Sequence, residues 1–310
     1  MQMLGLDVTV GKKQELGGLA VFPLFAGSEP GPGYLSGPDG LETGLAEVLE
    51  LDPPSVPSLQ VVNHGGMPVL FIEGECLLGG DQNRTLNVSV LCGAGQTTVV
   101  PVSCVEAGRW GMSRSMSRSQ HNLPGSLRSA KTRSIVSDAD MDADGAETVS
   151  RRSDQGLVWQ EVARQTERFA ASSPTQALSD VQEEVTPRIE NMVAALTVEP
   201  GQTGAAYGVG GRVVGLDLFD RPKTLERYLP GLVAGYALDA LDLEPGTTPS
   251  EAVEAFLAEL AGADLTELAG VGLGTELRFT ARDLAGIGLA VDGHLVHLAA
   301  FAGAADSGAW

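Results

Sequence analysis

The stretch GAAYGVGGRVVGLDLF, residues 204–219, places short apolar runs on both sides of the pair Gly210–Gly211. Consecutive glycines between two such runs are typical of a tight β-hairpin. A second stretch, GIGLAVDGHLVHLAAF at 286–301, has the same organisation around Asp292–Gly293, a dipeptide that strongly favours hairpin turns. The two stretches align from end to end on their turns. Similar local constraints explain this likeness better than an ancient duplication.

Helical patterns precede and separate these hairpins. Residues 153–171, SDQGLVWQEVARQTERFAA, carry an apolar stripe at helical spacing behind a cap at Ser153 or Asp154. We expect a second helix to begin at Ser173, which proline follows at the first helical position, and to kink or split at Pro187.

Two further helices are predicted at 221–241 and 248–260. In the second of these, Thr248 and Glu251 are placed to form a capping box. Helices packed on antiparallel hairpins make residues 154–310 an α+β domain.

Residues 19–110 form a series of predicted short strands. Segments such as LAVFPLFAG, SLQVVN and TTVVPVSCVE are rich in Val, Leu and Ile, and Gly, Pro and Asn separate them. This spacing is typical of an antiparallel sandwich or barrel. We therefore expect residues 1–110 to form a β-rich domain, and the chain as a whole to be of the α+β class.

The composition changes between the two expected domains. Residues 107–137 contain six Lys or Arg and no Asp or Glu, whereas residues 138–147, DADMDADGAE, are strongly acidic. Serine-rich stretches with opposed charge blocks are usually mobile loops. Residues 111–153 are therefore predicted to be a basic and then acidic mobile loop.

The acidic run also resembles the first half of a calcium-binding loop, through Asp140, Asp142 and Asp144. Position twelve of such a loop would be Arg151, where a glutamate is needed, and no helix pattern leads into it. A solvated linker is the better interpretation, and a calcium site is the alternative.

The formal net charge of the 310-residue chain is −20, so its surface as a whole repels nucleic acid and anionic membranes. The N-terminal residues do not have the pattern of a signal peptide, and no segment is apolar for long enough to be a membrane helix. Cys76, Cys92 and Cys104 show no disulfide framework spacing, which fits reduced thiols. These features predict a cytoplasmic protein.

Two glutamates stand out in FIEGECLL, residues 71–78. If this segment is a strand, Glu73 and Glu75 share one face at roughly 7 Å. Two carboxylates at that distance suit acid–base catalysis or a divalent cation, and Gly74 between them lets a ligand approach the backbone. The alternative is a solvent-facing strand, on which the glutamates simply meet water.

Two polar segments follow. GGDQNR supplies Gln82, Asn83 and Arg84, whose directional donors suit a carbonyl, ribose or phosphate, although a polar hairpin loop has the same composition. PVSCVEAGRW, residues 101–110, ends a strand with Glu106, Arg109 and Trp110. Cys104 on the same strand is expected to be a buried structural thiol, because no histidine is placed beside it as a base; a nucleophilic role is the alternative.

Four motifs in this order, EGECLLGGDQNR, PVSCVEAGRW, SDQGLVWQEV and GGRVVGLDLFD, resemble the family named for its association with ADP-ribosylglycohydrolases and rhodanese-phosphatases. The resemblance extends from about Gly18 to Phe301. It implies a nucleotide or ADP-ribose-type ligand, by association alone. The positions that match its polar motifs are Glu73, Glu75, Gln82, Asn83, Arg84, Cys104, Glu106, Arg109, Trp110, Asp154, Gln155 and Trp159.

These positions predict a cleft between the domains that binds an anionic, nucleotide-like molecule. Arg84 and Arg109 would hold phosphate, Trp110 or Trp159 would stack on a base, and the three glutamates would lie near the sugar. Three hypotheses follow: a hydrolase acting on ADP-ribose or a related nucleotide, a sensor that binds such a ligand or an RNA end, and a structural interaction protein. The glutamates favour the first, and the missing histidine base and metal ligands favour the second.

Overall fold

A computed structural model describes residues 2–3, 6–27, 31–109, 111, 114–137, 139–141, 147–244 and 246–303, with the backbone alone considered for 2–3, 6, 139–141 and 147–149. The helices are α1 (Gly37–Glu42), α2 (Gly125–Ser137), α3 (Gln155–Arg168), α4 (Leu178–Ala194), α5 (Pro222–Ala240) and α6 (Ser250–Ala261). Over the described ranges, no helix is long and apolar enough to span a bilayer.

The strands fall into four groups. The large sheet contains β1 (Gln2–Met3), β2 (Leu6–Val10), β3 (Gln14–Leu16), β4 (Leu19–Gly27), β16 (Gly204–Val209), β17 (Arg212–Phe219), β18 (Asp264–Ala269), β19 (Thr275–Ala281), β20 (Leu284–Val291) and β21 (His294–Ala302). The barrel contains β6 (Ala46–Ser55), β7 (Ser58–Asn63), β9 (Cys76–Gly79), β10 (Arg84–Leu86), β12 (Thr97–Cys104) and β13 (Ser115–Arg118). Small sheets contain β5 (Leu35–Ser36), β8 (Val69–Phe71) and β11 (Val90–Cys92), and β14 (Ala139–Met141) with β15 (Glu147–Val149).

Both predicted hairpins are confirmed and form the centre of the large sheet. β16 turns into β17 at Gly210–Gly211, β20 turns into β21 at Asp292–Gly293, and β17 pairs with β21. Each hairpin shifts register at the same aligned place, after Tyr207 in one and after Leu289 in the other. The large sheet is antiparallel throughout.

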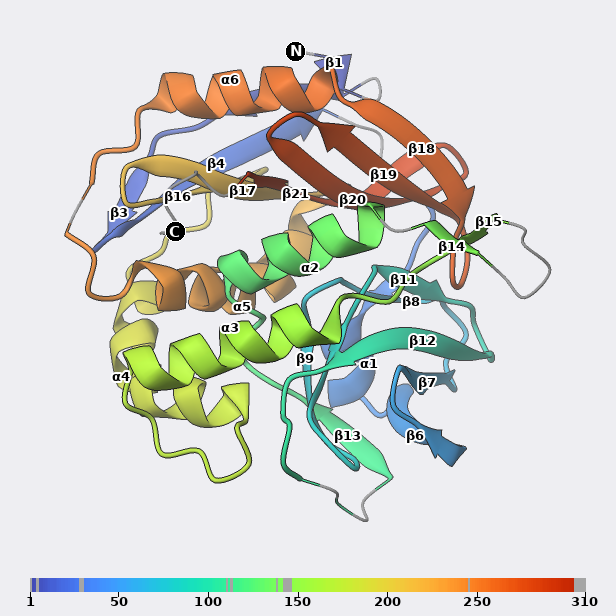
Figure 1. Ribbon diagram of the computed structural model, residues 1–310. Coiled ribbons are helices and arrows are strands. Elements are labelled where there is room, and N and C mark those ends of the chain that lie inside the picture. The colour runs from blue at the N-terminus through green and yellow to red at the C-terminus, as the bar shows by residue number, and fades with distance from the viewer. Residues whose placement is uncertain are drawn as a thin grey trace.

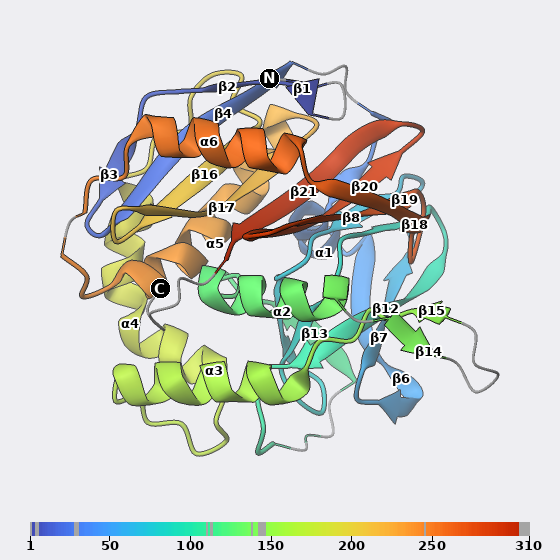
Figure 2. The same ribbon diagram turned by 45° about the horizontal axis from the view of Figure 1, so that its top comes forward.

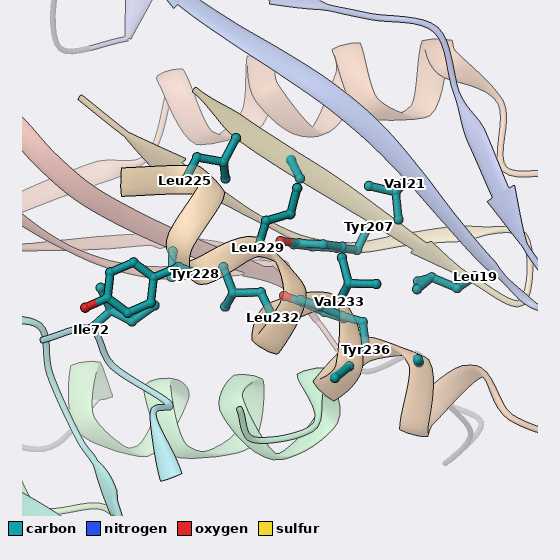
Figure 3. Close-up of a cluster of buried hydrophobic side chains, with 14 of the residues drawn as sticks. Leu19, Val21, Ile72, Tyr207, Leu225, Tyr228, Leu229, Leu232, Val233 and Tyr236 are labelled. Carbon is teal, nitrogen blue, oxygen red and sulfur yellow. The ribbon is translucent and has the colours of Figure 1, made fainter. Parts of the chain in front are cut away.

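Alternate residues of the large sheet face different helices, as the two-residue period of a strand requires. Val21 packs in the core that contains α5, whereas Phe22 packs in the core that contains α6. Figure 1 shows α6 on one face of the sheet and α5 and α2 on the other. In the α5 core, the ring of Tyr207 stacks on that of Tyr236 with centroids 3.8 Å apart (Figure 3).

The barrel lies on the other side of the large sheet from α6 (Figure 1, Figure 2). It closes in the order β10, β12, β7, β6, β13, β9 and has its own apolar interior, to which Val48, Leu59, Leu86 and Val100 belong. The α+β class and the antiparallel barrel expected from the N-terminal half are confirmed.

The large sheet crosses the expected boundary between residues 1–110 and 154–310, because Leu19–Leu24 of β4 pair with the whole of β16. The basic part of the segment 111–153 also differs from a loop, since it forms β13 and α2. Helix α2 buries Arg128 and Lys131 against carboxylates from elsewhere in the chain. Charge composition does not reveal this burial, because the neutralising partners are remote in sequence.

Two helix ends are corrected. Helix α3 begins behind Asp154, whose side chain accepts from the backbone of Gly156 and Leu157, as predicted. Helix α4 begins at Leu178 instead of Ser173 and continues through Pro187, so of the expected kink or split, the split is wrong. At α6 the cap is Pro249, which has no side-chain hydrogen bond, so the predicted capping box is also wrong.

Candidate binding groove around Arg118

The segment expected to be one strand with two neighbouring glutamates is a turn. The chain leaves β8 at Phe71 and reverses at Gly74, whose φ of +79° is a left-handed conformation that glycine adopts without strain. Glu73 and Glu75 flank this turn, and their carboxylates contact different cations. The predicted common strand face is therefore wrong, although both residues are fully buried.

Glu73 is neutralised inside the protein. Its Oε1 accepts from Arg128 Nε at 2.9 Å and its Oε2 accepts from Lys131 Nζ at 3.1 Å. Arg128 also donates to Asp217, whose other neighbour is His297 at 3.3 Å. Burial opposes ionisation of Asp217, but Arg128 and His297 together outweigh it and lower the pKa of Asp217 to about 2. This network joins α2, the large sheet and the turn, and it leaves Glu73 no free oxygen for a substrate.

Glu75 lies behind Arg118 of β13. Its Oε1 accepts from Arg118 Nε at 2.8 Å, and its Oε2 accepts from the backbone of Ile72 at 2.7 Å. Burial raises the pKa of Glu75, and the guanidinium of Arg118 opposes that rise. Because Glu75 has no exposed surface, it acts on a ligand only through Arg118.

Glu106, Arg109 and Asn83 come together, whereas Glu73 and Glu75, which were expected in the same cleft, contact other cations. Arg109 donates to both oxygens of Glu106 at 3.0 Å, to Asn83 Oδ1 at 2.9 Å and to the carbonyl oxygens of Gly79 and Gly80. Burial opposes ionisation of Glu106, but hydrogen bonds from Arg109 and from the backbone of Asn83 outweigh it and lower the pKa of Glu106. These contacts brace the turn after β9, and they engage all three guanidinium nitrogens of Arg109.

Gln82 and Arg84 face inward. Arg84 is almost fully buried, and its Nη1 donates to Gln82 Oε1 at 3.2 Å. The carboxylate of Glu50 lies 4.0 Å from Nη2 of Arg84. Burial raises the pKa of the adjacent Cys104 thiol, which opposes formation of a nucleophilic thiolate.

The α3 motif has structural contacts. Gln155 donates to the carbonyl oxygen of Cys104 and accepts from its N–H, as a neighbouring strand would. Asp154 caps α3, and Trp159 on the same helix is 44% exposed. Trp110 lies outside the described residues.

The structure offers no support for the cation suggested at Glu73 and Glu75. Within the described ranges, no group of three or more His, Cys, Asp or Glu side chains is arranged to hold a metal ion. For the alternative calcium site, Asp142 and Asp144 lie outside the described residues, and of Asp140 only the backbone is described.

Two adjoining hollows border Arg118. Hollow 1, about 510 Å³, lies between α1, β6 and β13, and hollow 2, about 390 Å³, lies between α1, α4 and α5. Pro38, Glu42, Arg118 and Gln120 line both, so the two hollows form one continuous depression, which we call the Arg118 groove. Volumes of this size suit small organic ligands.

Arg118 lies at the junction of the hollows. Its side chain is 18% exposed, and Nε is committed to Glu75. Nη2 is buried and has no hydrogen-bond partner among the described residues, and the guanidinium carbon lies 5.7 Å from the ring centroid of Tyr228. A guanidinium held from behind by a buried carboxylate is fixed in direction, which is suitable for recognising a ligand oxygen.

Sequence reasoning placed Arg118 in a basic loop and missed this role. The available signal was the alternation in SMSRS, residues 115–119, which is a strand period that directs Arg118 and Met116 to one face. The pairing with Glu75 needs the barrel, because β13 contacts β9 only in the folded chain.

Comparison with known proteins agrees with the motif resemblance. The family model described as the ARG and Rhodanese-Phosphatase-superfamily-associated Protein domain matches residues 7–301. No curated protein and no solved structure matches the chain. Since the family model extends over nearly all of the 310 residues, the chain belongs to the ARG and Rhodanese-Phosphatase-superfamily-associated Protein domain family.

Proposed function

We propose that this protein binds ADP-ribose or a related nucleotide in the Arg118 groove without consuming it. The observation that carries the proposal is the partly exposed guanidinium of Arg118, which Glu75 holds in place and which lines both hollows. A pyrophosphate at this junction would accept hydrogen bonds from Arg118, and the two ends of the molecule would extend into hollows 1 and 2.

The lining of hollow 1 supports this arrangement. Ser117, Ser119 and Gln120 contribute hydroxyl and amide groups beside Arg118, and Glu47 contributes an acceptor for sugar hydroxyls. The name of the family associates it with ADP-ribosylglycohydrolases, which is consistent with a ligand of this class.

Binding is better supported than hydrolysis. Each glutamate predicted to be catalytic is committed to a cationic side chain: Glu73 to Arg128 and Lys131, Glu75 to Arg118, and Glu106 to Arg109. Glu73 and Glu75 are also fully buried, so neither reaches a bound substrate as an acid or a base.

The test is calorimetric titration with ADP-ribose. Arg118→Ala is expected to weaken binding at least tenfold, by roughly 1.5–3 kcal/mol, the usual contribution of a charge-assisted hydrogen bond. Arg114→Ala is the matched control, because Arg114 lies one residue before the same strand, is exposed, pairs with Asp52 and lines neither hollow. It should change the affinity less than twofold.

A further variant separates loss of binding from loss of folding. Arg118→Gln combined with Glu75→Gln removes the buried charge pair as a unit, so no uncompensated carboxylate remains. It should fold and still bind weakly. Absence of binding by the unmodified protein, or unchanged affinity in Arg118→Ala, would overturn the proposal. Chromatography measures whether ADP-ribose is converted to smaller products. If it is, the proposal of binding alone is replaced by one of hydrolysis.

A further inference from the structure

Hollow 2 has an apolar floor and an acidic rim. The floor is formed by aliphatic side chains of α4 and α5: Ile189, Val193, Ala194, Pro230 and Ala234. Carboxylates of Glu42, Glu190 and Glu226 stand at the rim. An apolar surface bordered by carboxylates suits an organic group that carries positive charge.

The cationic side chains of hollow 2 are already neutralised. Arg227 pairs with Asp39 at 2.9 Å and with Glu42 at 2.6 Å, and Arg118 pairs with Glu75. Burial lowers the pKa of His121, which favours its neutral form.

Two of the three rim carboxylates, in contrast, have no cationic partner among the described residues. Glu190 on α4 and Glu226 on α5 are exposed and make no ion pair or hydrogen bond with any described residue. They therefore leave the hollow with unbalanced negative charge.

A second observation points to a ligand in the same place. Asn122 is fully buried, and neither Oδ1 nor Nδ2 of its side chain has a hydrogen-bond partner among the described residues. A Cβ added to Gly231, which lines hollow 2, would lie 3.0 Å from Asn122 Oδ1 and 3.3 Å from Arg118 Nη2. Asn122 itself does not line hollow 2 but lies behind Gly231, so a ligand group that reaches past Gly231 would gain the hydrogen bonds that this amide lacks.

We infer that hollow 2 is a subsite for an organic cation, such as an alkylated heteroaromatic ring or a protonated amine. Glu190 and Glu226 attract the charge, and Val193 and Pro230 contact the carbon framework. The inference rests on the proposed function in one respect, that a single ligand spans both hollows. The ligand then carries phosphate at Arg118 and a positive end group in hollow 2.

The experiment uses small probes that fill hollow 2 alone. The affinity of 1-methylnicotinamide, a permanent cation, is compared with that of neutral nicotinamide by NMR titration, and protonated butylamine is compared with butanol. At least one cation is expected to bind about fivefold or more tightly than its neutral counterpart, since each exposed charge pair contributes modestly. Comparison of 1-methylnicotinamide with protonated butylamine shows whether hollow 2 prefers an alkylated heteroaromatic ring or a protonated amine.

Charge removal supplies the decisive control. Glu190→Gln combined with Glu226→Gln should abolish the preference for the cation. Glu183→Gln combined with Glu184→Gln, two exposed carboxylates of α4 that do not line the hollow, should retain the preference.

The inference is overturned if neither cation binds, or if each cation binds only as tightly as its neutral counterpart. It is also overturned if the preference for the cation persists in the Glu190 and Glu226 variant. ADP-ribose binding that persists alongside such a result would leave the proposed function intact. If the unmodified protein prefers the cation but does not bind ADP-ribose, the proposed function is overturned and the inference about hollow 2 stands.

Discussion

Arg128 donates from Nη2 to Oδ1 of Asp217 at 2.6 Å, although the two residues are 89 positions apart in the sequence. Both side chains are fully buried, and Arg128 also contacts Glu73 in the turn after β8. One guanidinium therefore holds α2 between the large sheet and the turn that carries Glu75. Because Glu75 orients Arg118, this network also supports the binding groove.

Removing Arg128 should be severely destabilising. Arg128→Met leaves the Glu73 and Asp217 carboxylates buried with too little compensating charge, so the free energy of unfolding is expected to fall by about 3–5 kcal/mol. Urea unfolding followed by circular dichroism measures the change. Arg282→Met is the control, because Arg282 is almost fully exposed, and it should change stability by less than about 0.5 kcal/mol. A loss below about 1 kcal/mol for Arg128→Met would contradict the role of the network.

Gly74 should not tolerate a side chain. Its φ is +79°, and an added Cβ would lie 2.8 Å from Arg128 Nε. Gly74→Ala is expected to cost more than about 2 kcal/mol, from backbone strain together with displacement of Arg128. Gly44→Ala separates the two effects, since Gly44 has φ +69° but open space around its Cα, and should cost about 1 kcal/mol. Equal losses in both variants would show that the contact with Arg128 is unimportant.

The pH dependence of stability should contain a contribution from Asp239. Burial raises its pKa to about 6, and hydrogen bonds from Ser126 oppose that rise. A carboxyl whose folded pKa exceeds its unfolded value holds its proton more tightly when folded, so stability falls as pH increases from about 4 to 6. The decrease in the free energy of unfolding between pH 4 and 7 is expected to be roughly 2–3 kcal/mol, and Asp239→Asn should remove it. Unfolding titrations across that range measure it, and an identical slope in protein and variant would refute the prediction.

The thiols should be unreactive and dispensable for binding. All three cysteines are buried, and burial raises the pKa of Cys76 and Cys92 to about 12 and also raises that of Cys104. Thiol reagents should therefore modify the native protein far more slowly than the unfolded chain. Cys104→Ser should retain ADP-ribose affinity within about threefold. Complete loss of binding in a folded Cys104→Ser variant would instead make Cys104 a reactive centre.

The sequence by itself determined the local features of this protein. The two hairpin turns follow from glycines that accept the required backbone angles, and the start of α3 follows from the cap at Asp154. These features depend on residues that are close in the chain. The contact between Glu106 and Asn83, in contrast, joins residues 23 positions apart and depends on the pairing of β10 with β12.

Tertiary structure decided the rest, including the roles of the glutamates. Glu73 and Glu75 are adjacent in sequence to Gly74, yet one contacts Arg128 and the other Arg118 because the turn directs them apart. The pairing of β4 with β16 likewise joins segments that no local pattern connects. A buried charge is tolerated only when an oppositely charged side chain from elsewhere in the fold lies beside it. The periodicity of the sequence does not indicate which side chain that is. For this reason the groove around Arg118 emerged only from the folded chain.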